Sequence, residues 1–335
     1  MPRQIDPTTA RGLSPRLDEA LEIVCNEFEG LDPHRQYLNA FSRVLKFDPL
    51  GRVLMMGTDQ RDLFIPLLRR AIENHVPASG HIFDFGAGDG QTFALVADAV
   101  PAGTTVSFEE PNPVYRAAYR AFLGRQAHIQ PGMAASTGLD ELESETRSDA
   151  AELPTPGSVD LALGLHMIYF ATDIVGCLQV MLRLVKRGGA LFNVVTDEAT
   201  AYGGTVLRAF IDSGGDTGSN DRCLAAIEER QRLLAPIEEG GGGLNDAVAK
   251  MGIGVEVESI RQPSRMYGHT LADLLAVANI GVLTSVPGTL KFEAAAKTLR
   301  DRCEEVDLRI ETDGPRMGMW SVTQPQWVTQ VRRVR

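Results

Sequence analysis

The stretch Ile82–Gly90, IFDFGAGDG, decides the fold. Apolar residues lead into three alternating glycines, Gly86, Gly88 and Gly90, and the apolar-periodic stretch Gln91–Val100 follows them. This order predicts a strand, a tight glycine turn and a helix. Glycines let backbone approach a ligand because no Cβ intervenes, and a helix start offers free N–H groups. The stretch therefore predicts a ligand site at the turn.

A carboxylate stands twenty residues beyond the turn, where the predicted strand Thr104–Glu110 (TTVSFEE) ends. There Glu110 could accept hydrogen bonds from both hydroxyls of a ribose, which predicts a nucleoside ligand. The dinucleotide fingerprint G-x-G-x-x-G requires a third glycine at the place of Gln91. The G-x-G-x-G found here resembles the first motif of class I methyltransferases, so we interpret the nucleoside as S-adenosylmethionine (SAM). A glycine turn in another α/β domain is the alternative.

Composition places the chain among soluble globular proteins. Its 335 residues are 44% hydrophobic and 23% charged, which suits one large domain or two smaller ones. The formal net charge of −11 argues against nonspecific binding of nucleic acid, which needs a basic surface. We expect a small-molecule partner, no membrane partner and an oligomeric state that the sequence leaves open.

Cysteine and histidine spacing predicts no metal site. The four cysteines form no C-x-x-C pair, and the six histidines are scattered without the spacing of metal ligands. The first residues, MPRQIDPTTARG, lack the apolar core of a signal peptide, and no run of 18 or more apolar residues occurs. We therefore expect reduced thiols and a cytoplasmic location.

Helices are expected to dominate the N-terminal part, residues 1–78, which we interpret as a lid and substrate-binding segment. Residues 1–15 look loose. The predicted helices of this part are Leu17–Phe28, His34–Lys46 and Asp62–Asn74.

Residues 79–335 are expected to form the SAM-binding core, with extra helices at about 200–252 and 270–310. Alternating strands and helices predict a parallel sheet with right-handed crossovers. The predicted strands are Ile82–Phe85, Thr104–Glu110, Ala127–Gln130, Val159–Leu165, Ala190–Thr196, Val255–Ile260 and two antiparallel strands within Met317–Val334. The predicted helices are Gln91–Val100, Pro113–Leu123, Asp173–Lys186, Thr205–Ile211, Arg222–Leu234, Leu244–Met251, Thr270–Ile280 and Leu290–Leu308. Gly188–Gly189 is expected to end the helix before it, Gly240–Gly243 to form a loop, and Leu139–Pro156 to form a surface loop.

Five stretches together resemble histamine N-methyltransferase and its relatives, which are class I methyltransferases acting on small molecules. They are His34–Phe41 (HRQYLNAF), Phe85–Gly90, Phe108–Asn112 (FEEPN), Asp160–Asp173 (DLALGLHMIYFATD) and Asp273–Thr284. The resemblance implies an α/β, Rossmann-like class I methyltransferase fold, with a mostly parallel seven-stranded sheet and a helical N-terminal lid. Its register implies Glu110, not Glu109, as the ribose ligand.

Two substrate positions depart from the family. Asn39 stands where the histamine enzyme has an acidic residue that meets the substrate ammonium, and His166 stands where the family has a glutamine. The resemblance therefore does not identify histamine as the acceptor, while the positions that match the cofactor site are kept.

Each predicted site residue has a stated role. His166 falls just past a buried strand, where α/β sheets place their ligands, and its imidazole could take a proton from an acceptor or hydrogen-bond it. The predicted cofactor contacts are Gly86, Gly88, Glu110, Ser136 and Leu165. The predicted substrate contacts are Tyr37, Asn39, Phe41, Tyr169 and Phe170. For all of them, ordinary packing or solvation is the alternative role.

The sequence thus predicts a SAM-dependent methyltransferase of specialised metabolism, with S-adenosylhomocysteine as its second product. The methyl group would pass by direct in-line displacement to a small molecule, at a nitrogen if the resemblance holds. An O- or C-methyltransferase on the same fold, a SAM-binding protein without transfer activity and an NAD-dependent enzyme remain alternatives.

Overall fold

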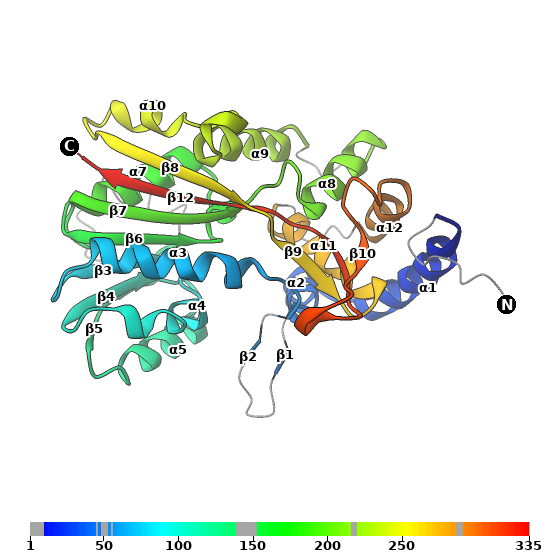
Figure 1. The fold of residues 1–335 in the computed structure, drawn as a ribbon, viewed down its shortest axis with the longest axis horizontal. Coiled ribbons are helices and arrows are strands. Elements are labelled where there is room, and N and C mark those ends of the chain that lie inside the picture. The colour runs from blue at the N-terminus through cyan, green and yellow to red at the C-terminus, as the bar shows by residue number, and fades with distance from the viewer. Residues whose placement is uncertain are drawn as a thin grey trace. The chain divides into compact units, whose positions relative to one another are not determined.

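The computed structural model describes residues 10–44, 46–47, 53–54, 56–138, 153–215, 220–285 and 291–334. Its contacts group into two units (Figure 1). The first, here the sheet unit, comprises Arg61–Val195, Glu228–Gln262 and Trp327–Arg335. The second, here the helical unit, comprises Met1–Gln60, Thr196–Ile227 and Pro263–Gln326. The predicted boundary at residues 78–79 differs from this grouping, in which each unit is assembled from three stretches of the chain.

The sheet unit is built on a seven-stranded sheet of order β5-β4-β3-β6-β7-β12-β8. Its strands are β3 (His81–Phe85), β4 (Thr104–Glu109), β5 (Ile129–Ala135), β6 (Val159–Leu165), β7 (Val185–Thr196), β8 (Val255–Gln262) and β12 (Gln326–Arg333). The pairings from β5 through β7 are all parallel. The chain moves outward from β3 to β5 and then returns to β6 on the other side of β3, so strand order reverses between β3 and β6. Ligands of open α/β sheets bind at such a reversal, beyond the carboxyl ends of the strands.

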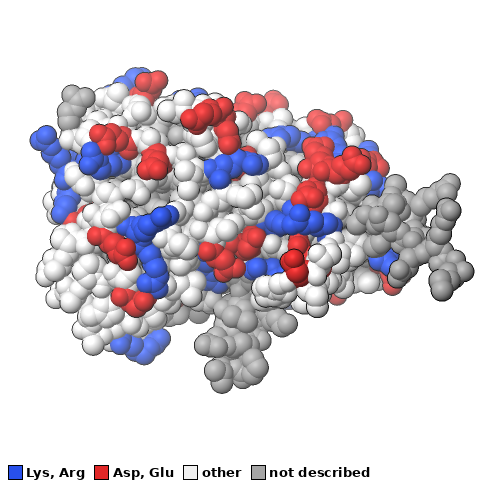
Figure 2. Space-filling model, in the orientation of Figure 1, with Lys and Arg blue, Asp and Glu red and all other residues white. Residues whose placement is uncertain are grey.

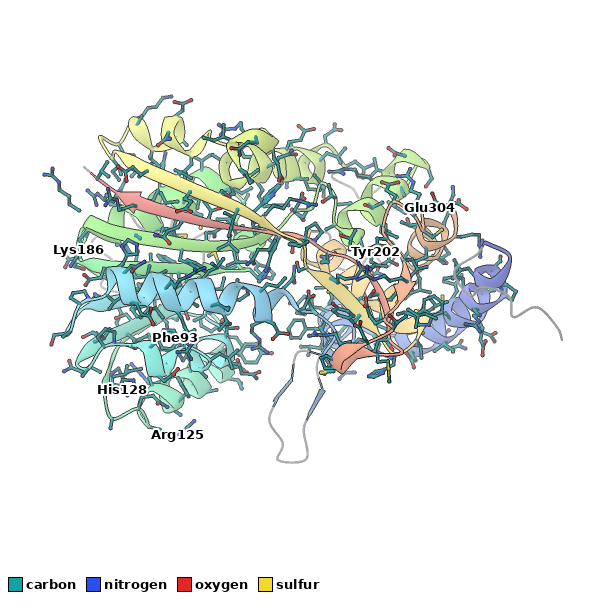
Figure 3. The ribbon with its side chains drawn as sticks, viewed as in Figure 1. Phe93, Arg125, His128, Lys186, Tyr202 and Glu304 are labelled. Atoms are coloured by element: carbon teal, nitrogen blue, oxygen red, sulfur yellow. The ribbon has the colours of Figure 1, made fainter. Side chains whose placement is uncertain are left out.

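Helices cover this sheet because each carries an apolar stripe. The helices of this unit are α3 (Gln60–His75), α4 (Gln91–Ala94), α5 (Pro113–Leu123), α7 (Ile174–Leu184), α9 (Asn220–Leu234, shared with the helical unit) and α10 (Leu244–Ala249). Phe64 and Leu68 of α3 and Tyr119 of α5 join one apolar cluster with the strand residues Ile82 and Leu163. Phe93, labelled in Figure 3, belongs to the same cluster. These contacts hold the first turn of α3 over the strands that carry the glycine turn.

The helical unit is organised around α11 (Leu271–Ser285), which packs against the unit's four other helices. Those four are α1 (Ala10–Phe28), α2 (Pro33–Ser42), α8 (Tyr202–Asp212) and α12 (Phe292–Asp301). The sequence of α11, LADLLAVANIGVLTS, is apolar nearly all round, as a centrally buried helix requires. Tyr202, labelled in Figure 3, is buried in the same core. The unit also contains the hairpin β1 (Lys46–Phe47) and β2 (Val53–Leu54).

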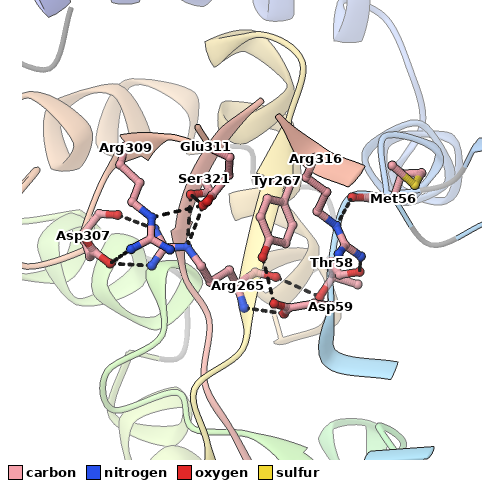
Figure 4. A network of polar contacts seen from close by, with 10 residues as sticks. All are labelled: Met56, Thr58, Asp59, Arg265, Tyr267, Asp307, Arg309, Glu311, Arg316 and Ser321. Carbon is pink, nitrogen blue, oxygen red and sulfur yellow. Dashed lines mark hydrogen bonds and ion pairs between the residues drawn. The ribbon is translucent and has the colours of Figure 1, made fainter. Parts of the chain in front are cut away.

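A small sheet of order β10-β11-β9 completes the helical unit, and a buried arginine ties it together. Its strands are β9 (Arg265–Gly268), β10 (Arg309–Ile310) and β11 (Trp320–Thr323). Arg265, 8% exposed, donates to Asp307 and to Ser321 Oγ at 3.0 Å, and its Nε lies 3.4 Å from a carboxylate oxygen of Glu311 (Figure 4). Its carboxylate partners sit beside cations, which is the arrangement that buried charges require.

Several predicted boundaries differ from the structure for physical reasons. The predicted helix 91–100 ends at Ala94 and continues as a turn and the short 3₁₀ helix Ala97–Ala99. The predicted helix 290–308 ends at Asp301, and Asp307 then adopts φ +45°, which a helix cannot contain. The predicted strand 127–130 starts at Ile129 and runs to Ala135, because Pro131 is tolerated on the edge strand β5.

Other predictions that differ from the structure concern Gly188–Gly189, the start of the chain and the tail. Gly188–Gly189 lies inside β7 at a register shift against β6, and α7 ends earlier, at Leu184. Helix α1 begins at Ala10 and contains Pro15, so only residues 1–9 of the predicted loose start lie outside the described residues. The two strands predicted in the tail exist, but β11 and β12 belong to different sheets. Most of the predicted loop 139–156 lies outside the described residues.

Charged side chains of both signs are mixed on the surface. Figure 2 shows blue and red groups interspersed over the drawn face, without a continuous basic area. The whole chain has 44 acidic and 33 basic side chains, and the drawn face carries both kinds.

Candidate functional site

The glycine turn after β3 presents one open position between two packed ones. A Cβ at Gly86 would lie 2.6 Å from Met167 Cβ, and one at Gly90 would overlap the ring of Tyr119. A Cβ at Gly88 would meet no described atom within 4 Å. Gly88 and Gly90 have φ of +59° and +80°, a region that side chains with a Cβ rarely adopt. Gly88 is thus the place where a ligand can reach the turn.

The carboxylate of Glu110 is fastened beside that open position. Glu110 follows β4 directly and is 7% exposed. Its Oε2 accepts from the N–H of Gly88 at 2.8 Å, and its Oε1 accepts from the N–H of Asn112 at 2.7 Å. Each carboxylate oxygen can accept more than one hydrogen bond. The carboxylate of Glu110, the residue predicted to bind a ribose, is therefore pre-oriented, and its oxygens can still accept hydrogen bonds from ligand hydroxyls.

Two further carboxylates lie at the same turn, and together with Glu110 they form what we call the acidic set. Asp84, 3% exposed, accepts from the hydroxyl of Tyr119 at 3.1 Å. Glu109, fully buried, accepts from the N–H of Gly86 at 2.9 Å. In the described part of the chain, no ion pair within 4 Å reaches any member of the acidic set. The turn N–H groups of Gly86 and Gly88 are therefore engaged by carboxylates.

Burial dominates the electrostatics of the acidic set. Burial raises the pKa of Asp84 to about 7, a shift that the hydrogen bond from Tyr119 opposes and the charge of Glu110 reinforces. Burial likewise raises the pKa of Glu109 to about 7, a shift that the N–H of Gly86 and the charge of Arg116 oppose and the charges of Glu110 and Asp84 reinforce. Sequence reasoning missed Asp84 and Glu109. The available signal was an acidic residue inside otherwise apolar strands, IFDF and VSFE.

His166 begins the loop after β6 in a strained backbone conformation. Its φ is +56°, uncommon for a residue other than glycine, and its N–H donates to Val194 O at 2.9 Å. Its Nδ1 lies 3.2 Å from the hydroxyl of Tyr169, and its ring centroid lies 5.8 Å from that of Phe64 on α3. Such strain persists only where surrounding contacts impose it, and it gathers at functional sites.

The two aromatic residues after His166 differ in exposure. Tyr169 is half-buried and its ring lies parallel to the His166 ring, with 6.3 Å between centroids. Phe170 is 51% exposed. Arg230 of α9, itself 4% exposed, places its guanidinium carbon 5.6 Å from the centroid of Tyr169, a contact that the sequence did not indicate. The structure thus brings His166 and Tyr169 together with a buried arginine.

The remaining predicted cofactor contacts also lie in the sheet unit. Leu165 ends β6 and is half-buried against the apolar cluster of that unit. Ser136 follows β5 and is exposed. Since β6 adjoins β3, Leu165 is close to the glycine turn in the sheet order, while Ser136 belongs to the edge strand.

The three predicted lid contacts lie on α2 in the helical unit. The rings of Tyr37 and Phe41 are stacked with centroids 6.0 Å apart, and both pack against the core of that unit. The backbone carbonyl of Asn39 accepts from Ser42 Oγ at 2.7 Å. The aromatic pair is therefore half-buried in packing, as its apolar spacing on one helix face allows.

The described residues contain neither a cluster of metal ligands nor a membrane-spanning helix. Among the residues that the structure describes, no three His, Cys, Asp or Glu side chains gather as metal ligands would. Within the same residues, no helix has the length and apolar character needed to cross a membrane.

Comparison with known proteins gives only remote structural likenesses. No protein-family model matches the chain, and no curated protein matches it in sequence. A putative methyltransferase from Bacillus halodurans is 9% identical, with TM-score 0.46, covering 81% of this chain and 98% of its own. A putative sarcosine dimethylglycine methyltransferase from Galdieria sulphuraria is 11% identical, with TM-score 0.44 and coverages of 90% and 98%.

The plantazolicin methyltransferase BamL, solved with a desmethyl-plantazolicin analogue and SAH, is 10% identical, with TM-score 0.42 and coverages of 96% and 100%. At such scores and identities, none of these likenesses carries an argument about this chain. The fold rests on the strand order and parallel pairing of the seven-stranded sheet itself.

Proposed function

We propose that the chain is a SAM-dependent methyltransferase that methylates a nitrogen of a small molecule. The observation that carries this proposal is the pairing of Glu110 with the N–H of Gly88 at the reversal of strand order. This pairing joins a ribose-binding carboxylate to the one open glycine of the turn, which suits a nucleoside ligand.

The acidic set favours SAM over a dinucleotide. A pyrophosphate needs free backbone N–H groups, but here Gly86 and Gly88 donate to Glu109 and Glu110. Three carboxylates without ion pairs in the described residues would repel phosphate and attract the sulfonium and ammonium charges of SAM. The residues present therefore fit SAM, whose sulfonium would supply an electrophilic methyl group.

In the proposed site, each residue of this chain has a limited task. Glu110 would hold the ribose, and Gly86, Gly88, Leu165 and Ser136 would line the cofactor position. His166, oriented by Tyr169, would accept a proton from the acceptor or hydrogen-bond it. Within the sheet unit, the proposed acceptor contacts are Tyr169 and Phe170. The remaining requirement is to hold the acceptor in line and exclude water.

The test is turnover with SAM bearing a labelled methyl group and a panel of acceptors. The panel should include imidazoles, aryl amines, phenols and activated carbon acids, with S-adenosylhomocysteine and methylated product both quantified. We expect transfer to a nitrogen acceptor, and we expect His166→Asn, which tolerates positive φ, to lower kcat by roughly 10²–10⁴ without weakening SAM. Transfer only to oxygen or carbon would contradict nitrogen as the acceptor atom. SAM binding without any transfer would leave a non-catalytic SAM-binding protein.

A further inference from the structure

Arg61 lies in the first turn of α3, and its guanidinium has no hydrogen-bond or ion-pair partner among the described residues. Its side chain is half-buried, and burial lowers the pKa of Arg61 while the charges of Asp62 and Asp89 raise it. Within the described part of the chain, Arg61 makes no hydrogen bond and no ion pair within 4 Å. By contrast Arg69, on the same helix, pairs with Asp98 and donates to Leu95 O at 2.8 Å.

Packing places the first turn of α3, which carries Arg61, beside the loop after β6. Phe64, three residues along the same helix, is buried and its ring lies 5.8 Å from that of His166, in the loop after β6. The charge of Asp89, which precedes Gly90 in the glycine turn after β3, acts on Arg61 and raises its pKa. Arg61 thus lies on the helical turn that packs beside the loop after β6, and it feels the charge of Asp89 in the glycine turn.

The glycine turn therefore has both acidic and basic side chains in its surroundings, and they come from different elements. Asp84 lies on β3, Glu109 ends β4 and Glu110 follows it, whereas Arg61 comes from α3. The amino-acid end of SAM is itself a zwitterion, with an ammonium and a carboxylate on one carbon. A guanidinium binds a carboxylate through two parallel hydrogen bonds, and partial burial strengthens such a pair.

We propose that Arg61 binds the α-carboxylate of the amino-acid end of SAM and of S-adenosylhomocysteine. This inference rests on the proposed SAM site and adds the residue that recognises the end of the cofactor remote from the ribose. It makes Arg61 a binding residue that distinguishes SAM from nucleosides without a carboxylate.

The experiment is calorimetric titration of the full chain with S-adenosylhomocysteine and with 5′-methylthioadenosine, which lacks the amino-acid carbons. For Arg61→Gln we expect S-adenosylhomocysteine affinity to fall by roughly 10–100-fold and 5′-methylthioadenosine affinity to change by less than about twofold. Arg61→Lys should lie between, because it keeps the charge but not the fork. Arg70→Gln, an exposed neighbour on α3, is the matched control and should change neither affinity.

A measurement on the wild type alone keeps the inference testable if the variants fold poorly. SAM and its decarboxylated analogue should differ in affinity by roughly tenfold or more. Equal affinities for these two ligands, or equal losses of S-adenosylhomocysteine and 5′-methylthioadenosine in Arg61→Gln, would overturn the role of Arg61. An unchanged S-adenosylhomocysteine affinity in Arg61→Gln would also overturn it, and would leave an acidic acceptor as the partner of Arg61. Failure of all these nucleosides to bind the folded wild type would instead remove the proposed function.

Discussion

The two units bury their carboxylates in opposite ways. In the helical unit, burial alone would raise the pKa of Glu311, but hydrogen bonds from Ser321 and Arg309 and the charges of Arg309 and Arg265 lower it. In the sheet unit, burial raises the pKa values of Asp84 and Glu109 to about 7, and no cation within the described residues pairs with them. The first arrangement stabilises a fold, whereas the second costs stability in the ligand-free protein.

This contrast separates a structural network from a site prepared for a ligand. An ion network that supplies its own cations has no need of another molecule. An acidic set that has no ion pair among the described residues is stabilised by a positively charged ligand, since an opposite charge nearby favours the ionised carboxylate. The two tryptophans allow each unit to be followed alone, because Trp320 is buried in the helical unit and Trp327 in the sheet unit.

The largest effect is expected from removing the buried cation of the helical unit. Arg265→Ala leaves Glu311 and Asp307 without their central partner, so we expect a loss of about 3–5 kcal/mol in the free energy of unfolding. Arg309→Ala, whose side chain is half-exposed, should cost about 0–1 kcal/mol. Urea unfolding in a Trp327→Phe background, followed by Trp320 fluorescence, measures both. Similar losses in the two variants would contradict the structural role of Arg265.

A pair of glycine substitutions separates packing from ligand access in the turn. Gly90→Ala places a Cβ into the ring of Tyr119 at positive φ, so we expect a loss of about 2–3 kcal/mol in stability. Gly88→Ala meets open space and should cost only about 1 kcal/mol, yet it should weaken SAM by roughly tenfold or more. Unfolding curves and SAM titrations of both variants check this. Unimpaired SAM binding by Gly88→Ala would show that the ligand does not approach there.

Asp84→Asn should stabilise the sheet unit at neutral pH and above. Because the folded pKa of Asp84 is raised to about 7 from 3.8, the folded chain keeps a proton that the unfolded chain has released. Its contribution to the free energy of unfolding therefore falls as pH rises from about 4 to about 7 and stays low above that window. The variant should gain about 2 kcal/mol near pH 8 and little near pH 4. Trp327 fluorescence in a Trp320→Phe background follows it, with the exposed Glu73→Gln as control. A loss of stability near pH 8 would contradict the unpaired state of Asp84.

The smallest effect is expected in the pH dependence of SAM affinity. Binding of a cation favours the ionised forms of Asp84 and Glu109, so SAM should bind up to about tenfold more tightly near pH 7.5 than near pH 6, with protons released on binding. Uncharged 5′-methylthioadenosine should show a weaker dependence. Calorimetry in buffers of different ionisation enthalpy counts the protons. Identical pH profiles for both ligands would contradict the electrostatic role of the acidic set.

Local sequence signals predicted much of the sheet unit. Apolar runs predicted β3 and β6 nearly to the residue, because a parallel strand buried on both faces needs such a run. The predicted helix Pro113–Leu123 coincides with α5. Thr270 and Asp273 exchange hydrogen bonds at the start of α11, where the sequence predicted a helix from Thr270. The fold class follows from the alternation of predicted strands and helices along the chain.

Non-local features escaped the sequence. Nothing in the tail shows that β11 joins β9 while β12 enters the large sheet, because that choice depends on partners far along the chain. The sequence could propose Gly86, Gly88 and Glu110 as site residues because their spacing is local. Asp84, Glu109, Arg61 and Arg230 were missed, since burial and the absence or presence of a partner are properties of the folded chain.

The most direct measurement is calorimetric titration of SAM into the folded wild type, Glu110→Ala and the exposed control Glu73→Ala. We predict saturable binding by the wild type and by Glu73→Ala, and a loss of roughly 1–3 kcal/mol of binding free energy in Glu110→Ala. Absence of SAM binding to the folded wild type would contradict the SAM site at the glycine turn. Undiminished binding by Glu110→Ala would show that SAM is held elsewhere.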